Sequence, residues 1–269
     1  RSSKARKSRE MVQLDLIELA DLVRPDQIVA EILRQNPQLP VPVPLELLAE
    51  HAGISKIEAF DSEGFEGALL TNPTKSDGAI FFSSRSPRPR QRFTIGHELG
   101  HFLLPWHRQA NFQCTTEDIS SRTNKDWEIQ ANQFSADMLM PAPLVKARLL
   151  QLKDPELAHV LTLRDEFETS MEMTARRVVE LNEYPCAVVF SKDNVVRYSV
   201  WSPYFSRRLS VKKGDKLPSK SPAKAGTSDP DEWHELGAYW WLTEQPGADD
   251  QPESVYEQTF VQENGFKVT

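Results

Sequence analysis

The chain has 269 residues, of which 39% are hydrophobic, which suits one large or two modest globular domains. Its formal net charge of −7 argues against direct nucleic-acid binding, because an acidic protein repels phosphates. Two cysteines make no disulfide framework and no apolar run is long enough to cross a bilayer, so we expect a cytoplasmic protein that does not contact membranes.

The first third of the chain predicts helices followed by strands. Residues 1–10 predict a flexible basic tail, because five of the first nine side chains are basic. Apolar residues recur at helical spacing over 11–35, where Pro25 is expected to open the second of two helices. A proline-rich connector over 37–44 leads into a short helix that ends at Gly53.

Strands are predicted from residue 56 onward. Residues 56–60 alternate between polar and apolar, and the segments 67–70 and 79–82 flank a turn. An arginine-rich connector follows, which we interpret as a solvated loop; the alternative is a rim that attracts an acidic partner. Its arginines are Arg85, Arg88, Arg90 and Arg92.

The motif H-E-x-x-H stands at His97, Glu98 and His101, inside an apolar helical run. Residues four apart share one face of a helix, so both imidazoles point the same way and make half of a zinc site. Glu98 is placed to take a proton from an attacking water molecule. Gly96 and Gly100 lack side chains, which would let another backbone pass close to the metal.

A catalytic zinc usually has three protein ligands, so a third ligand is needed. His107 lies six residues after the motif, but Leu104 stands where a metzincin needs a glycine. Glu128 lies near the start of a second predicted helix, which Pro141 ends, and it shares a face with Asn132. The residues leave both candidates open, and we prefer Glu128.

Three segments carry a family resemblance: R-F-T-I-x-H-E-L-G-H at 92–101, E-x-x-A-N-x-F-x-A at 128–136 and L-M-P at 139–141. Together they resemble the ImmA/IrrE family of zinc metallopeptidases. Three departures leave the proposed ligands untouched: Gly96 stands where alanine is common, Ser135 replaces an alanine and Asp137 replaces a glutamate.

The resemblance implies that Zn²⁺ is held by His97, His101 and Glu128, with Glu98 as the general base. It also implies a protein substrate, a helix-turn-helix (XRE-type) transcriptional repressor that is cut to induce stress-response or mobile-element genes. The strand just before the metal helix is expected to pair through its edge with an extended substrate.

A polar stretch over 105–126 links the two metal helices and holds Cys114. One hypothesis makes Cys114 a latency ligand, whose thiolate fills the open position on zinc until oxidation or substrate binding releases it. We prefer the alternative that Cys114 is a small buried residue in a structured loop.

The last third predicts more helices and then a β-rich module. The segment 144–183 resembles a helix-turn-helix pair, but its acidic residues would repel phosphates, so we interpret it as a packing part of a peptidase domain over 11–183. A C-terminal module of unknown role covers 185–269, with a hairpin, a mobile basic loop over 206–224 and an acidic, aromatic stretch over 229–263. The aromatic residues favour a sheet core over a ligand pocket.

The whole pattern predicts an α+β protein, with a helical zinc-peptidase core and a small β-sheet, then a helical segment and a C-terminal β-rich module. The preferred function is a zinc-dependent endopeptidase. The alternative is a non-proteolytic, zinc-containing module that binds a repressor or acts in a toxin–antitoxin pair.

Overall fold

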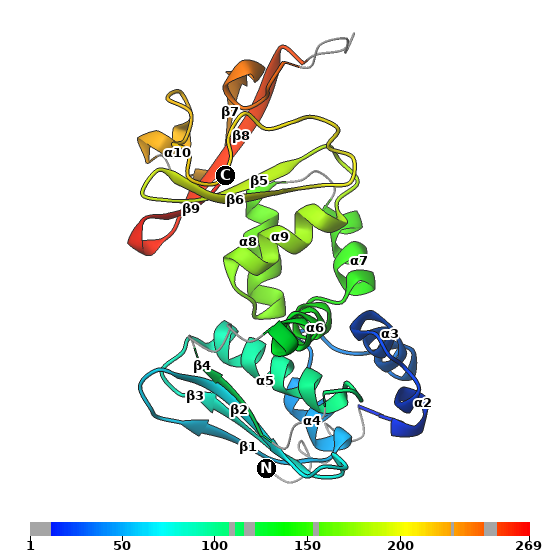
Figure 1. Ribbon diagram of the computed structural model, residues 1–269. Helices are drawn as coiled ribbons and strands as arrows, with labels where there is room; N and C mark the ends of the chain where they lie inside the picture. The colour runs from blue at the N-terminus through cyan, green and yellow to red at the C-terminus, as the bar shows by residue number, and fades with distance from the viewer. Residues whose placement is uncertain (1–11, 108–110, 116–121, 153–155, 227–228, 245–251) are drawn as a thin grey trace, which may run out of the picture. The chain divides into compact units, whose positions relative to one another are not determined.

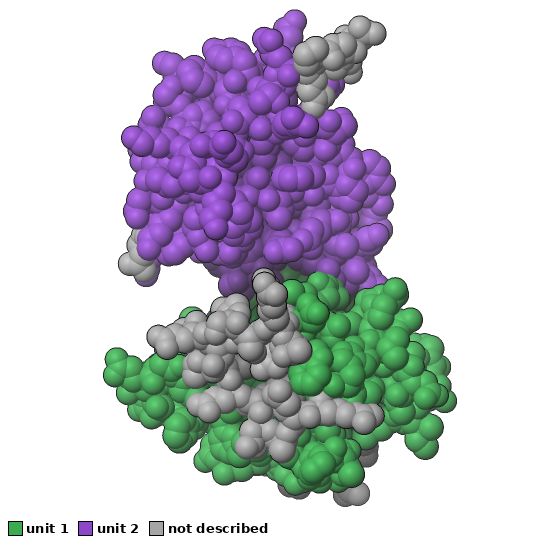
Figure 2. Space-filling view, in the orientation of Figure 1, with its two compact units in different colours: residues 1–141, 166–169 green, residues 142–165, 170–269 purple. Residues whose placement is uncertain are grey.

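The computed structural model describes residues 12–107, 111–115, 122–152, 156–226, 229–244 and 252–269 (Figure 1). The fold is α+β, as predicted, and the chain divides into two compact units. The first comprises residues 1–141 and 166–169, and the second comprises 142–165 and 170–269 (Figure 2). No described helix is long and apolar enough to cross a bilayer.

The helices of the first unit follow the local signals of the sequence. Pro25 stands in the first turn of α3, as predicted, and Gly53 ends α4 with a left-handed φ of 112° that favours glycine. The helices are α2 (Leu16–Ala20), α3 (Pro25–Gln35), α4 (Leu45–Ala52), α5 (Arg88–Leu103) and α6 (Arg122–Leu139).

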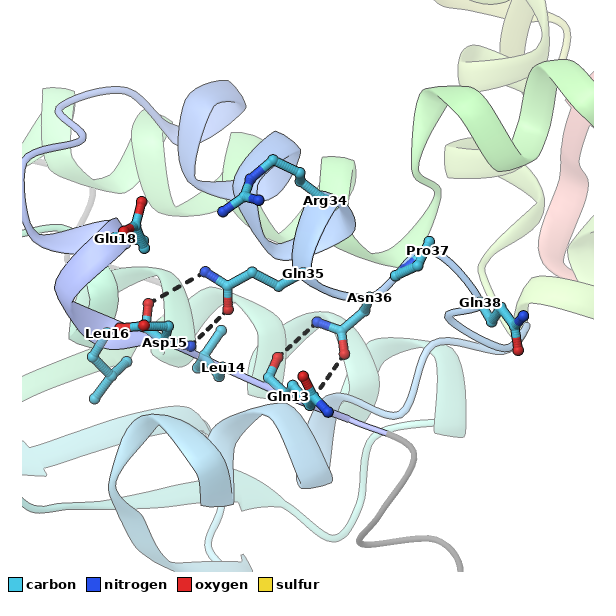
Figure 3. Close-up of a pocket in the computed structure, with 10 residues that line it drawn as sticks. All are labelled: Gln13, Leu14, Asp15, Leu16, Glu18, Arg34, Gln35, Asn36, Pro37 and Gln38. Atoms are coloured by element: carbon cyan, nitrogen blue, oxygen red, sulfur yellow. Dashed lines mark hydrogen bonds between the residues drawn. The ribbon is translucent and has the colours of Figure 1, made fainter.

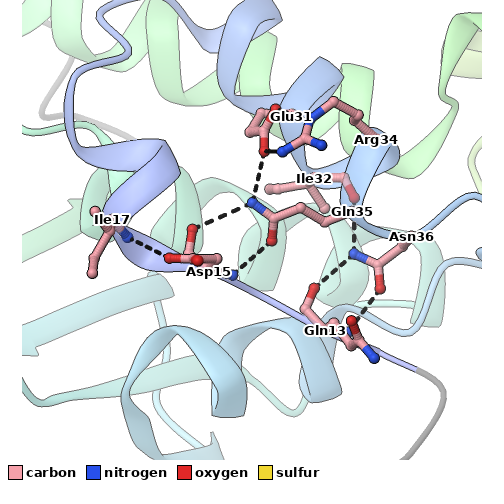
Figure 4. Close-up of polar contacts among 8 residues, drawn as sticks. All are labelled: Gln13, Asp15, Ile17, Glu31, Ile32, Arg34, Gln35 and Asn36. Carbon is pink, nitrogen blue, oxygen red and sulfur yellow. Dashed lines mark hydrogen bonds and ion pairs between the residues drawn. The ribbon is translucent and has the colours of Figure 1, made fainter.

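The N-terminal segment is tied to the end of α3 by side-chain amides (Figure 4). The buried Asn36 accepts a hydrogen bond from Gln13 N at 2.8 Å and donates to Gln13 O at 2.7 Å, as a peptide group would. The preceding residue, Gln35, bonds in the same two-way manner to the backbone of Asp15. These contacts hold the segment from residue 12 onward against α3.

A four-stranded sheet covers one side of α5, in the order β1-β3-β2-β4. β1 runs parallel to β3, and the β2–β3 and β2–β4 pairs are antiparallel. The expectation that the strand before the metal helix offers a free edge is wrong, because β3 is paired on both sides; β4 is an edge strand instead. The strands are β1 (Ile54–Phe60), β2 (Phe65–Thr71), β3 (Gly78–Ser83) and β4 (Asn111–Thr115).

The arginine-rich connector is mostly helix, which corrects the solvated-loop interpretation. α5 begins at Arg88, because a proline in the first turn of a helix loses no hydrogen bond. Arg92 is only 2% exposed and donates to Val43 O at 2.9 Å. Arg88 and Arg90 pair with Glu46 and Glu66. Arg92 is therefore packed in the interior, whereas Arg88 and Arg90 form ion pairs with neighbouring carboxylates.

In the second unit, helices pack against a five-stranded antiparallel sheet in the order β6-β5-β9-β8-β7. The helices are α7 (Ala142–Leu152), α8 (Leu157–Phe167, whose last two residues belong to the first unit), α9 (Met171–Leu181) and α10 (Pro222–Ala225). The strands are β5 (Ala187–Lys192), β6 (Val195–Trp201), β7 (Asp229–Gly237), β8 (Ser254–Val261) and β9 (Phe266–Val268), with 3₁₀ turns η1 (Ala238–Trp240) and η2 (Glu263–Gly265).

The predicted hairpin of the second unit is present as β5 and β6. Its turn residues Asp193 and Asn194 have φ values of 51° and 64°, which asparagine and aspartate tolerate better than other side chains. The basic segment over 206–224 is packed rather than loose, because Leu217 and Ala223 are buried in the core around Trp241. The helices over 144–183 lie in this unit, apart from residues 166–169.

Candidate metal centre

Helix α5, which carries the H-E-x-x-H motif, lies between the sheet and α6 (Figure 1). Gly96 and Gly100 permit a close crossing: a Cβ on Gly96 would come 2.6 Å from Ser135 Oγ, and a Cβ on Gly100 would come 3.0 Å from the ring of Phe134. Ser135 Oγ of α6 donates a hydrogen bond to Phe93 O of α5 at 2.8 Å, which joins the two helices. The two glycines of α5 thus allow α6, the second predicted ligand helix, to pack closely against α5.

Three side chains converge at this crossing. His97 Nε2 lies 3.1 Å from Glu128 Oε2, His101 Nε2 lies 3.2 Å from Glu128 Oε1, and the two Nε2 atoms are 3.1 Å apart. Zinc bonds of about 2.0–2.1 Å would set tetrahedral ligand atoms about 3.4 Å apart. The three groups therefore fit a small divalent cation with little adjustment.

The outer nitrogens of both imidazoles are held by hydrogen bonds. His97 Nδ1 bonds to Asn132 Oδ1 at 3.0 Å, and His101 Nδ1 bonds to His107 Nδ1 at 2.9 Å. Because an amide oxygen only accepts, His97 carries its proton on Nδ1 and turns the lone pair of Nε2 toward the centre. Asn132 thus orients a ligand, as its position one turn after Glu128 allows.

His107 lies behind His101, on the side away from Glu128. Its Nε2 bonds to Gln130 Oε1 at 2.9 Å, so Nε2 carries the proton and Nδ1 accepts from His101. Trp106 Nε1 donates to the same Gln130 oxygen at 2.7 Å, and the ring of His107 stacks on Trp127 at 5.0 Å. His107 is therefore placed to orient His101 and not to bind the metal in this arrangement.

Sequence reasoning missed Gln130, Trp106 and Lys75. Lys75 Nζ donates to His101 O and Leu104 O, each at 2.7 Å, and so satisfies carbonyls at the end of α5. Gln130 follows Glu128 by two residues, a spacing that puts the two on different helix faces, so no periodic signal pointed to it.

The electrostatics of the site favour a positive charge at its centre. Burial opposes a charge on His97, but the hydrogen bond to Glu128 and the charges of Glu98 and Glu128 outweigh it, so its pKa is raised. Burial and the neighbouring His97 lower the pKa of His101 to about 4, against the hydrogen bond to Glu128. Burial also works to raise the pKa of Glu128, yet its bonds to His101 and His97 hold it well below its usual range. A divalent cation would satisfy all three groups.

Glu98 is fully buried beside the sheet. A Cβ on Gly67 of β2 would lie 3.0 Å from Glu98 Oε1 and 2.2 Å from Thr94 Cγ2, so β2 passes directly over this part of α5. Cys114 pairs through its backbone with Gly67, in the β2–β4 register. The Cys114 side chain lies outside the described residues, and the latency hypothesis stays a prediction.

A polar hollow of about 1040 Å³ elsewhere in the first unit is not part of this centre. It is lined by residues 13–16, 18 and 34–38, between the N-terminal segment and the end of α3 (Figure 3). Arg34 there pairs with Glu31, and none of the lining residues is a candidate ligand. Among the described residues, the three candidate metal ligands lie instead at the α5–α6 crossing.

Comparison with known families agrees with this geometry. Residues 49–179 match the model of Peptidase_M78, the IrrE N-terminal-like domain, which covers both metal helices and extends to α9. This match supports an ImmA/IrrE family metallopeptidase domain over these residues. The resemblance drawn from its three sequence segments is thereby confirmed. A search of curated proteins found no match.

Proposed function

We propose that this chain is a zinc-dependent endopeptidase of the ImmA/IrrE family, with the ion held by His97, His101 and Glu128. The observation that supports this most strongly is the convergence of the three side chains within 4.8 Å, with both outer imidazole nitrogens engaged elsewhere. Zinc in such a site would polarise a peptide carbonyl and activate a water molecule.

Other residues of the chain have supporting roles. Glu98 takes the proton of the attacking water and returns it to the leaving amine. Asn132 and His107 fix the tautomers of the two imidazoles, and Gln130 fixes His107 in turn. Burial beside Gly67 keeps Glu98 away from bulk solvent.

The general-base role is tested with Glu98→Gln. The amide matches the carboxylate in shape but cannot take up the proton, so cleavage should fall about a thousandfold, or about 4 kcal/mol of transition-state stabilisation. Zinc content and thermal stability should stay close to wild type. Residual activity of Glu98→Gln within about tenfold of wild type would contradict the general-base assignment. If the wild-type protein binds a repressor but does not cleave it, the non-proteolytic alternative is favoured.

The third ligand is tested by metal analysis of Glu128→Ala and His107→Ala. Glu128→Ala should lose bound zinc, because it removes a ligand. His107→Ala should keep one zinc per chain with about tenfold weaker affinity, as loss of a residue that orients a ligand does. Loss of zinc from His107→Ala alone would overturn the assignment of Glu128.

We further propose that the substrate is a helix-turn-helix repressor of the XRE type, met in the cytoplasm, and that its cleavage induces stress-response or mobile-element genes. The family match supports this choice, as does the acidic balance that disfavours direct DNA binding. We also keep a peptidase domain over 11–183, which the family match to residue 179 supports. Incubation with a helix-turn-helix protein encoded beside the gene, with and without a chelator, tests the substrate.

A further inference from the structure

A turn joins β2 to β3 at residues 72–77, and its own side chains give it a defined shape. Asn72 Oδ1 accepts hydrogen bonds from Ser76 N at 3.0 Å and from Thr74 Oγ1 at 3.1 Å. Asn72 Nδ2 donates in turn to Ser76 Oγ at 2.8 Å, and Lys75 N donates to Asn72 O at 2.9 Å. Asparagine stabilises a turn in this way because its side chain can replace backbone partners. The turn therefore holds Lys75 in one place on the first unit.

Lys75 has a left-handed backbone conformation, with a φ of 53°. Glycine adopts this conformation freely, whereas a long side chain such as that of lysine makes it unfavourable. A residue stays in such a conformation only where surrounding contacts hold it there. At Lys75 these contacts are the hydrogen bonds of the turn and those that its ammonium makes to the end of α5. A lysine at a position that favours glycine indicates that the side chain itself has a role.

The ammonium of Lys75 supplies a hydrogen-bond donor that the end of α5 would otherwise lack. In a continuous helix the carbonyl of His101 accepts from the backbone N–H of residue 105, but Pro105 has no N–H. Lys75 Nζ donates to His101 O at 2.7 Å instead. The bond is favourable because His101 is fully buried and because a cation stabilises the C-terminal end of a helix. Lys75 thereby holds the backbone of a candidate metal ligand.

The same ammonium also holds the turn that leads from α5 to His107. Its second hydrogen bond, also of 2.7 Å, is to Leu104 O, and this oxygen accepts the backbone N–H of His107 at 3.2 Å. Leu104 ends α5 with an extended backbone, at a ψ of 114°, and is fully buried. Lys75 and His107 therefore meet at one carbonyl oxygen. From this turn the ring of His107 reaches back to His101, where the two Nδ1 atoms lie 2.9 Å apart.

We propose that Lys75 is a positioning residue of the metal centre and that it acts through His107. Its ammonium fixes the turn over 104–107, and that turn keeps His107 bonded to His101 Nδ1. The bond between the two imidazoles directs the Nε2 lone pair of His101 toward the metal, as partners of ligating histidines do. Lys75 itself touches neither metal nor substrate, so its contribution is to metal affinity. This role rests on the zinc site proposed above.

Zinc affinity of the full chain, measured by competition with a chromogenic chelator, tests this role. Lys75→Met keeps an unbranched stem but removes the ammonium, and it should weaken zinc binding about tenfold, as expected of His107→Ala. Lys75→Gly also removes the ammonium and suits the left-handed backbone, so it should fold even where Lys75→Met does not, and should lose about tenfold as well. Lys75→Arg, which offers donors to both carbonyls, should stay within about threefold of wild type. Lys56→Met removes a positive charge elsewhere in the first unit and should leave the Kd unchanged.

A double variant distinguishes action through His107 from a general loss of stability. In the His107→Ala background, Lys75→Met should weaken zinc binding by less than about twofold, because the residue through which it acts is already gone. A purely structural contribution would lower the stability of the metal-free chain without changing the Kd. Additive losses of affinity, or an unchanged Kd in both Lys75→Met and Lys75→Gly, would overturn the role of Lys75 alone. Absence of zinc binding by the wild type would overturn the proposed zinc site as well, so the two failures are distinguishable.

Discussion

Gly96 and Ser135 form a matched pair at the crossing of α5 and α6. Ser135 Oγ fills the space that a side chain on residue 96 would take, 2.6 Å from its ideal Cβ, and bonds to Phe93 O. Both positions departed from the family pattern in the sequence, where alanine is expected at each. The structure gives the reason: a hydroxyl at 135 requires glycine at 96.

Gly96→Ala should therefore destabilise the first unit, although alanine has the better helix propensity by about 1 kcal/mol. Overpacking against Ser135 costs about 1–3 kcal/mol, so a net loss is expected. In the Ser135→Ala background the same change should be neutral or stabilising. Urea unfolding of the four proteins in this cycle measures the coupling, and additive effects would show that the two residues do not interact.

At the scale of elements, the contact between β2 and α5 decides how Glu98 is held. β2 crosses α5 at Gly67, where no side chain separates the strand from Thr94 and Glu98. In the sheet, β2 lies between β3 and β4, and it packs against α5.

Gly67→Ala should lower activity by at least tenfold with little loss of zinc, because its Cβ would push against Thr94 Cγ2 and Glu98 and shift the proposed base. Thermal stability should also fall, by about 1–3 kcal/mol. Adding Thr94→Ser removes the closest clashing atom and should restore most of the stability. A Gly67→Ala protein as active as wild type would refute this role for the strand.

At the scale of the whole molecule, each unit has a hydrophobic core of its own. Buried residues of α5 and α6 pack in the first, and Val189, Val196, Leu217 and Trp241 form a cluster in the second. All three candidate metal ligands lie in the first unit. Bound metal stabilises only the part of a protein whose folding creates the site.

Calorimetric unfolding should consequently show two transitions that respond differently to metal. Removal of zinc by a chelator should lower the melting temperature of one transition. The corresponding loss in free energy of unfolding is about 4 kcal/mol if zinc is present at a thousand times its Kd. The other transition should stay in place. In Glu128→Ala neither transition should respond to the chelator, and equal shifts of both in the wild type would contradict a site confined to one unit.

Local patterns in the sequence predicted the elements and much of the candidate centre. The i, i+4 spacing of His97 and His101, the helix that carries Glu128 and Asn132, the Gly53 stop and the β5–β6 hairpin each depend on neighbours within a few residues. Short-range backbone geometry determines such features, so the sequence alone is sufficient for them.

Only the tertiary structure decided features that join distant residues. The bond from His107 to Gln130, the burial of Arg92 against Val43 and the pairing of Gly67 with Cys114 each connect positions more than 20 residues apart. A periodic signal shows which face of an element is buried, and the partner of that face is chosen by packing over the whole unit.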